Sequence, residues 1–394
     1  MCNDRAITHN SLYKLIQMAQ AAYQKSTLIK SSSGYMEVHY NNINFTDNID
    51  LLFKFDIDCK LDVIFNNCKF KNLQLIHKQF NVSLCFYNCK FQEKTIFTYT
   101  NFSNQSVFKD CIFNKYTDFQ DVDFDNVSFY NSTFKDDVRF CGASFDKSIF
   151  ARVKFHRFVD FTMTSIDKSK TSFMGCRTGY TIDDMRKLAA DKIDSLRESY
   201  CIIKSILISE HNILEAADWR KLELYAKEVE LESKKPKKFT REWIDKWQLT
   251  LYRYMCDHHT DILKIVECTL MCIATFVLYL FMLRYGLDFQ AFVNYYGLNI
   301  DGSFITDSKS LIPIYMSILL CFVWCQITRI IISVAIFLGL AFFEPRYIFG
   351  VVNLINDECL TELESIGIVL YSIIFMILIF SLQKTLRKSS IIPT

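Results

Sequence analysis

The sequence predicts a β-solenoid joined by a helical hairpin to an α-helical membrane region. Three observations lead to this fold class. Phe or Leu recurs every five or six residues from 65 to 161, within a segment, 41–176, that holds 23 of the 36 Phe residues. A charged segment with helical periodicity follows at 177–261, and long apolar runs fill much of 262–388. Residues 1–40 contain one further helical pattern and are expected to form an N-terminal helical cap.

Composition excludes several classes of protein. Hydrophobic residues make up 51% of the 394 residues and the formal net charge is +2, whereas a disordered chain has low hydrophobicity or high net charge. The near-neutral balance argues against a dedicated nucleic-acid binder, which usually carries a basic surplus. Residues 1–40 lack the apolar core of a secretory signal peptide. The 15 Cys residues are therefore expected to be reduced thiols in a cytosolic setting.

The repeat unit within 41–176 is expected to be a short strand followed by a turn. Phe or Leu recurs at steps of five or six from Phe65 to Phe161, and a small or β-branched residue usually stands two positions earlier. Residues five positions apart do not fall on one face of a helix. The strand period of two relates only the Phe or Leu of each unit to the small residue two positions before it. Both residues of the pair are expected to point inward.

Four units make one coil, because ring positions one coil apart differ by 21 or 22 residues. The first and second columns are Phe91, Phe113, Phe134 and Phe155, and Phe97, Phe119, Phe140 and Phe161. The third and fourth columns are Phe86, Phe108, Phe129 and Phe150, and Phe102, Phe124 and Phe145. At a strand spacing of ~4.8 Å, the rings of each column are expected to stack as a ladder inside a quadrilateral coil.

This repeat resembles the pentapeptide-repeat family, whose motif has a central Leu or Phe with a small residue two places earlier. The motif stands here as CKF (68–70), CKF (89–91), CIF (111–113), VSF (127–129), STF (132–134) and ASF (143–145). The resemblance covers about 41–176 and implies a right-handed, four-sided β-helix. The six-residue steps depart from a strict five and are expected to form bulged corners.

Cysteines recur within one column of the repeat. Cys68, Cys89 and Cys111 are 21 and 22 residues apart, so neighbouring thiols would come within the range of a disulfide. We favour small inward-facing side chains in a reducing compartment over a disulfide ladder.

The segment 177–261 predicts helices that cover the open end of the last coil. Thr181 before Asp184 is typical of a capped helix start. One apolar stripe follows at helical spacing, formed by Leu196, Tyr200, Ile203 and Leu207. A second helix is predicted over 214–233, which completes a hairpin. The run 197–228 resembles the linker that follows pentapeptide repeats in many bacterial membrane proteins, and this implies a location in the bacterial inner membrane.

Basic residues and tryptophans flank the apolar runs and are expected in the cytoplasmic headgroup zone. The residues are Lys237, Lys238, Arg241, Trp243 and Trp247 before the first run, and Lys384, Arg387 and Lys388 after the last. A nucleic-acid patch is the rival interpretation of the first group. In CDHHTD (256–261), a polar turn at the membrane entry is favoured over a metal site, because adjacent helical residues point about 100° apart. No metal or cofactor is expected.

Two to four transmembrane helices are expected. The runs 262–283 and 366–382 each predict one crossing. The run 311–343, interrupted by Gln326 and Arg329, is too long for one untilted span and short for two. It predicts a tilted helix, a hairpin or a re-entrant segment, and an intramembrane Arg329 is a candidate for a functional or anchoring residue.

Charge predicts the orientation of these helices. The loops 285–310 and 344–365 carry net charges of −2 and −4, whereas the segments before Ile262 and after Leu382 are basic. The positive-inside rule then places both chain ends in the cytoplasm. An even number of crossings follows, and the protein is expected to be multi-pass.

No enzyme is expected, because the sequence holds no Gly-rich phosphate loop, GxSxG or HExxH motif. The leading hypothesis is a membrane-anchored interaction protein whose cytoplasmic β-helix is a recognition or scaffold surface. Its expected partners are membrane lipids, an unidentified protein and further copies of itself.

The alternative is a gated ion-conducting or membrane-disrupting effector of the kind that bacterial defence systems against phage use. It would need an oligomeric pore, because YYGLN (295–299) is a poor match to a selectivity filter. DNA mimicry is disfavoured, since 41–176 carries 17 basic and 16 acidic residues and therefore lacks the charge of a duplex. No nucleic-acid partner is expected.

Overall fold

The computed structural model describes residues 26–30, 36–45, 61–258, 260–285 and 361–389, with a few single positions between 331 and 348. The chain divides into two compact units, Met1–Lys246 and Trp247–Thr394. The predicted helix at 12–23, the residues Gln326 and Arg329, and most of the run 311–343 lie outside the described residues.

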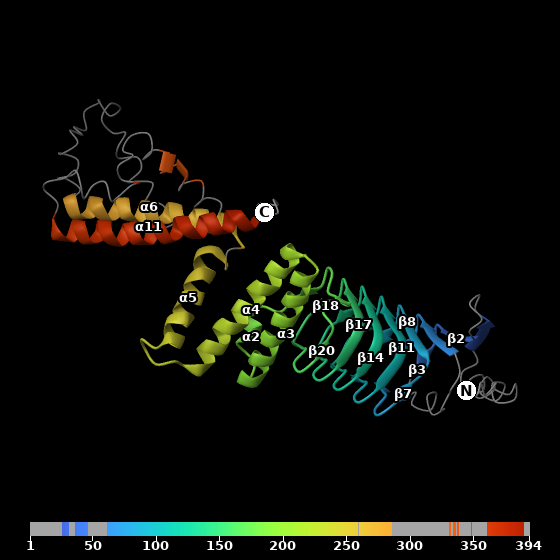
Figure 1. Ribbon diagram of the computed structural model, residues 1–394. Coiled ribbons are helices and arrows are strands. Elements are labelled where there is room, and N and C mark those ends of the chain that lie inside the picture. Colours follow the sequence, from blue (N-terminus) through green and yellow to red (C-terminus); the bar gives the residue numbers. More distant parts are fainter. Residues whose placement is uncertain are drawn as a thin grey trace. The chain divides into compact units, whose positions relative to one another are not determined.

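The first unit is a β-solenoid whose coils lie side by side (Figure 1). Its seven-stranded sheet consists of β3 (Asn44–Phe45), β5 (Lys69–Phe70), β9 (Lys90–Phe91), β12 (Ile112–Phe113), β15 (Thr133–Phe134), β18 (Lys154–Phe155) and β22 (Arg177–Thr178). Its five-stranded sheet consists of β6 (Leu73–Gln74), β10 (Thr95–Ile96), β13 (Thr117–Asp118), β16 (Val138–Arg139) and β19 (Val159–Asp160).

A ten-stranded sheet covers the remaining sides of the coil. It consists of β1 (Ser26–Lys30), β2 (Met36–Asn41), β4 (Leu61–Asn66), β7 (Gln79–Phe80), β8 (Ser83–Tyr87), β11 (Asn101–Lys109), β14 (Asp123–Tyr130), β17 (Ser144–Ala151), β20 (Ser165–Ile166) and β21 (Thr171–Ser172). Successive coils pair in parallel, as in β11 with β14, whereas β1 pairs with β2 antiparallel.

The strands β1 and β2 correct part of the expected helical cap at 1–40. The segment Met36–Asn41 pairs in parallel with β4, and the Tyr40 ring stacks on Phe65 at 5.1 Å between centroids. Tyr40 is buried and pairs with Phe65, so it takes the position that Phe takes in later coils. The first coil therefore begins before residue 41.

The four predicted columns of stacked rings are confirmed. Centroid separations are 4.4–5.7 Å in the first column, 4.8–5.0 Å in the second, 4.5–5.1 Å in the third and 5.1–5.5 Å in the fourth. The rings are almost fully buried. Each buried Phe contributes about 1.5–3 kcal/mol, and each stacked pair adds about 0.5–1.5 kcal/mol. The columns therefore form the core of the solenoid.

The corners of the coil use two conformations. Two of the corners join inward residues that are five positions apart. At these corners, the residue two positions after the first inward residue has a φ between 49° and 72°. These residues are Asn42, Asn67, Asn88, Asp110, Asn131, Arg152 and Gly175 at one corner, and His77, Tyr99, Asp121, Gly142 and Met163 at the other. Asn, Asp and Gly accept the left-handed region most readily, which accounts for much of the polar content of the repeat.

The six-residue steps behave in two ways. Between Phe102 and Gln105 the register of β11 against β14 shifts, because the six-residue step to Phe108 lies beside a five-residue step in the next coil. The expected bulge is confirmed here. Between the first and second columns the step has six residues in the four coils from Phe91 to Phe161, as from Phe113 to Phe119, and five only from Phe70 to Leu75. No register shift occurs in β12 and β13, because neighbouring coils match.

After five of the left-handed corners, a small residue donates to a buried backbone carbonyl. Cys68 Sγ donates to the carbonyl of Tyr40 at 3.2 Å, Cys89 Sγ to that of Phe65 at 3.3 Å, Cys111 Sγ to that of Phe86 at 3.3 Å, Ser132 Oγ to that of Phe108 at 2.9 Å and Cys176 Sγ to that of Phe150 at 3.1 Å. These cysteines are free, as expected. They are small donors that fit an apolar interior.

A helical hairpin covers the last coil. It consists of α3 (Ala190–Ser209) and α4 (Ile213–Lys234), preceded by the short α2 (Ile182–Met185). The predicted stripe on α3 is fully buried, and it belongs to the same apolar core as Phe161. Ser199 Oγ accepts the backbone N–H of Phe161 at 2.7 Å, so the helix also satisfies the open edge of the coil.

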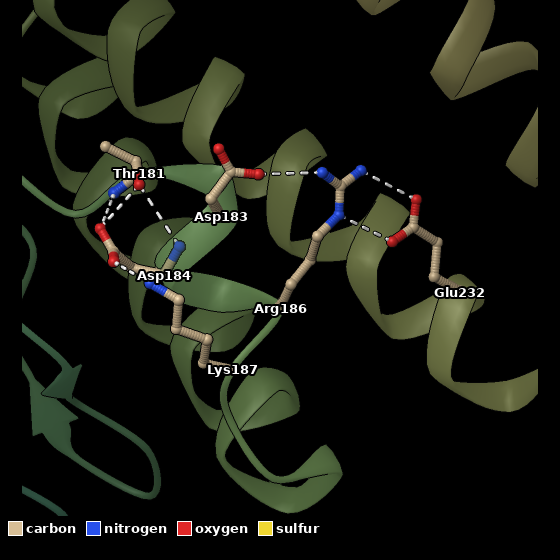
Figure 2. Close-up of polar contacts among 6 residues, drawn as sticks. All are labelled: Thr181, Asp183, Asp184, Arg186, Lys187 and Glu232. Carbon is tan, nitrogen blue, oxygen red and sulfur yellow. Dashed lines mark hydrogen bonds and ion pairs between the residues drawn. The ribbon is translucent and has the colours of Figure 1, made fainter.

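Polar contacts fix the start of α2 (Figure 2). Thr181 and Asp184 form the predicted reciprocal cap. Arg186 donates to Asp183 Oδ1 at 3.0 Å and, through Nε, to Glu232 Oε2 at 3.0 Å, which joins α2 to the end of α4.

We expect Phe119→Ala to destabilise the solenoid by about 3–5 kcal/mol, because it leaves a cavity between two stacked rings. Phe119 lies 5.0 Å from Phe97 and 5.0 Å from Phe140. Phe119→Leu should cost less, since Leu75 is fully buried at the head of the same column. Urea denaturation followed by circular dichroism measures both losses. Equal losses of stability in the two variants would show that a leucine side chain does not compensate for the cavity left by the Phe119 ring.

Candidate interaction and membrane-contact sites

The interior of the solenoid is packed with side chains through coils 61–178, so candidate sites lie on its outer faces. Among the described residues, no group of three or more His, Cys, Asp or Glu side chains could hold a metal ion. In the run CDHHTD, His258 is buried, and His259 lies outside the described part.

The helix α5 (Arg241–Cys256) holds three of the five interface residues predicted before the first apolar run, Arg241, Trp243 and Trp247. Lys237, Lys238 and Arg241 are exposed at its start, and Trp247 is 57% exposed. Trp243 is partly covered and packs against Phe239 in a tilted arrangement, with 5.3 Å between ring centroids. The structure therefore brings this predicted group together on one helix and the turn before it.

An exposed apolar stripe on α5 was missed by the sequence analysis. Ile244, Trp247, Leu251 and Tyr254 recur at steps of three, four and three, and their side chains are 53%, 57%, 49% and 61% exposed. This spacing places them on one face of the helix. The spacing of three and four is visible in the sequence. The prediction for this segment did not include it, because it rests only on basic residues and tryptophans that precede an apolar run.

The helices α6 (Ile262–Tyr285) and α11 (Glu362–Ser389) lie side by side (Figure 1). The rings of Phe276 and Tyr371 stack at 3.9 Å, and Tyr279 Oη donates to the carbonyl of Leu363 at 2.7 Å. Near the other end, Ile265 and Leu378 belong to one apolar cluster. The two helices are therefore antiparallel.

Within the described residues, one helix, Leu363–Leu386, is long and apolar enough to cross a membrane. Most of its sides are exposed, including the large apolar side chains of Ile366, Leu370, Ile373 and Phe380. Lys384 is exposed at its basic end, and Arg387 and Lys388 continue the helix there. The predicted run 366–382 falls inside α11 and the run 262–283 inside α6.

The end of α5 lies beside the basic end of α11. Met255 and Cys256 cluster with Leu378 of α11 and Ile265 of α6, and Leu382 packs against them. The start of α6 and the Lys384 end of α11 are thus at the same end of the antiparallel pair.

Comparison with known proteins supports the repeat. A sequence model of pentapeptide repeats, described as nine copies, matches residues 97–144. This span contains rings from all four columns. No curated protein and no solved structure matches the chain significantly.

We expect the solenoid to lose stability as the pH rises from about 9 toward 12. The neighbouring Cys111 thiol and burial raise the pKa of Cys89 to about 12, and burial raises the pKa of Cys176 to about 12. In the unfolded chain these thiols ionise near 9.0. Because the folded-state pKa is the higher one, the contribution to stability is complete below pH 9 and is lost toward pH 12.

Thermal melting at several pH values measures this loss. The variant Cys89→Ser/Cys176→Ser keeps a donor at both positions but cannot ionise in this range, so its melting temperature should fall less steeply. An identical slope in the variant would assign the effect to other groups, such as tyrosines.

Proposed function

We propose that this protein is a membrane-anchored recognition or scaffold module without catalytic activity. The observation that carries the proposal is α11, an apolar helix of spanning length whose large side chains are mostly exposed. Water disfavours such a surface, whereas lipid chains solvate it. The solenoid supplies a rigid surface of the kind on which repeat proteins bind partners.

The finer features of this proposal rest on the sequence. They are a right-handed coil, two to four transmembrane helices in a bacterial inner membrane, both chain ends in the cytoplasm, and a homo-oligomer with an unidentified protein partner but no nucleic acid. The preference of parallel crossover connections for the right hand supports the first feature. The basic end of α11 beside the end of α5 supports an even number of crossings.

We further propose that α5 lies in the headgroup zone with its apolar stripe toward the acyl chains. Trp247 and Tyr254 on one side and Arg241 and Lys246 nearby are typical of an interfacial amphipathic helix. Helices of this kind bury their apolar face ~5–10 Å below the boundary.

Fluorescence quenching tests the membrane placement. In vesicles that contain lipids brominated on the acyl chains, a variant that retains Trp247 as its single Trp should be strongly quenched. A matched variant that retains Trp219, which is only 2% exposed within the first unit, should not be quenched. Equal quenching of the two, or none, would contradict the interfacial position of α5.

Two further measurements separate the proposed function from its alternative. The purified full chain should float with vesicles and resist alkaline extraction, and liposomes that contain it should show no ion flux. Flux from such liposomes would favour the conducting or membrane-disrupting effector instead.

A further inference from the structure

The outer side of the seven-stranded sheet is strongly basic. The outward residue before each ring forms one row, from Lys69 through Lys90, Ile112, Thr133 and Lys154 to Arg177, as the pairing of successive strands shows. The outward residue after each ring forms a second row, Lys71, Gln92, Asn114, Lys135, His156 and Gly179. The left-handed corner forms a third row, Asn67, Asn88, Asp110, Asn131, Arg152 and Gly175.

These three rows hold seven basic residues and one acid, Asp110. We call the seven the lysine face: Lys69, Lys71, Lys90, Lys135, Arg152, Lys154 and Arg177. All seven are exposed. Asp110 already accepts a hydrogen bond from the Asn131 side chain. Since the whole segment 41–176 has 17 basic and 16 acidic residues, the positive charge is concentrated on this side of the coil.

The cations of the lysine face are left without counter-charges. None of the seven forms an ion pair with any residue that the structure describes. On the helical hairpin the pattern is the opposite: Arg186, Arg197, Lys204, Lys227 and Lys234 each bind a carboxylate within 3.0 Å. A surface with this density of unpaired cations repels itself and favours an anionic partner.

The lysine face is also flat. Successive rings beneath it are inclined by 3°, 13°, 2°, 12° and 6°, so the sheet has little of the usual twist. Seven strands at ~4.8 Å extend it over roughly 29 Å. A planar anionic layer can contact all of this surface at once, whereas a DNA duplex is a cylinder whose sequence is read within its grooves. The three rows contain no Phe, Tyr or Trp on which single-stranded bases could stack.

We propose that the lysine face docks the solenoid onto the anionic phospholipid headgroups of the membrane. The proposal rests on the membrane association proposed above, which would hold the solenoid close to that surface. It adds a second, purely electrostatic contact, which the apolar helices do not require. Such a contact depends on anionic lipid and is screened by salt.

Amine footprinting of the full chain in lipid nanodiscs tests this docking. The nanodiscs contain phosphatidylcholine alone or phosphatidylcholine with phosphatidylserine, and labelling at each lysine is read by mass spectrometry. Lys69, Lys90 and Lys154 should be labelled roughly fivefold less when phosphatidylserine is present, and high salt should restore labelling. Lys109, Lys147 and Lys168 are matched controls, because they are exposed and lie on other parts of the solenoid.

Charge reversal provides a second readout. The variant Lys69→Glu/Lys90→Glu/Lys154→Glu should lose the protection at Lys71 and Lys135. The control variant Lys109→Glu/Lys147→Glu/Lys168→Glu has the same change in net charge and should keep that protection. Unchanged circular-dichroism melting shows that both variants remain folded.

Several results would overturn the docking. They are equal labelling in both lipids, equal loss in the control lysines, or protection by added duplex DNA in place of phosphatidylserine. Recovery of the chain with the nanodiscs separates the two proposals. If the chain stays with the discs but its lysine face is not protected by phosphatidylserine, only the docking fails. If the chain does not stay with the discs, the proposed membrane association fails as well.

Discussion

Ring-on-ring stacking at the spacing of β-strands is the interaction on which the solenoid depends. A Phe ring is thinner than the distance between two strands, so the rings of one column must tilt or slide to stay in contact. Separations from 4.4 to 5.7 Å lie in the range of offset stacking. A coil of 21 or 22 residues keeps each ring in its column through most of the repeat. A longer coil, such as the 23 residues from Phe150 to Phe173, keeps the stacking by means of a longer turn.

The short repeat forces tight corners, and the corners determine the remaining inward residues. A left-handed residue turns the chain within five residues but leaves the carbonyl of the preceding ring residue turned toward the interior. The Cys or Ser that follows donates to the same carbonyl one coil earlier, as Cys89 does to Phe65. The high cysteine content of the repeat thus reflects hydrogen bonding at corners, and the raised pKa of Cys89 and Cys176 indicates chemically inert thiols.

The sequence was sufficient to predict the columns and the hairpin, because both depend on inward periodicity. The sequence was insufficient where the regular spacing of inward residues between successive coils is interrupted. Phe173 stacks on Phe150 at 4.5 Å but follows it by 23 residues, since the turn at Asp167–Lys170 lengthens the last coil. The strand Met36–Asn41 contributes Tyr40 in place of Phe. The lysine face could not be recognised without the strand register, because a net charge summed over 41–176 hides its separation into faces.

The stacked interior also explains why positive charge can be concentrated on the outer side of the seven-stranded sheet. With the interior fixed by rings and small donors, the outward positions of the seven-stranded sheet are exposed or half-buried, so their residues contribute little to the core. On the seven-stranded sheet these positions hold lysine and arginine without counter-charges, although carboxylates are available, as the paired Arg186 and Lys204 show on the hairpin. A solvated face needs only solubility, and mixed charges would provide it. A flat sheet face with seven cations and one carboxylate is better explained by an anionic surface that lies against it.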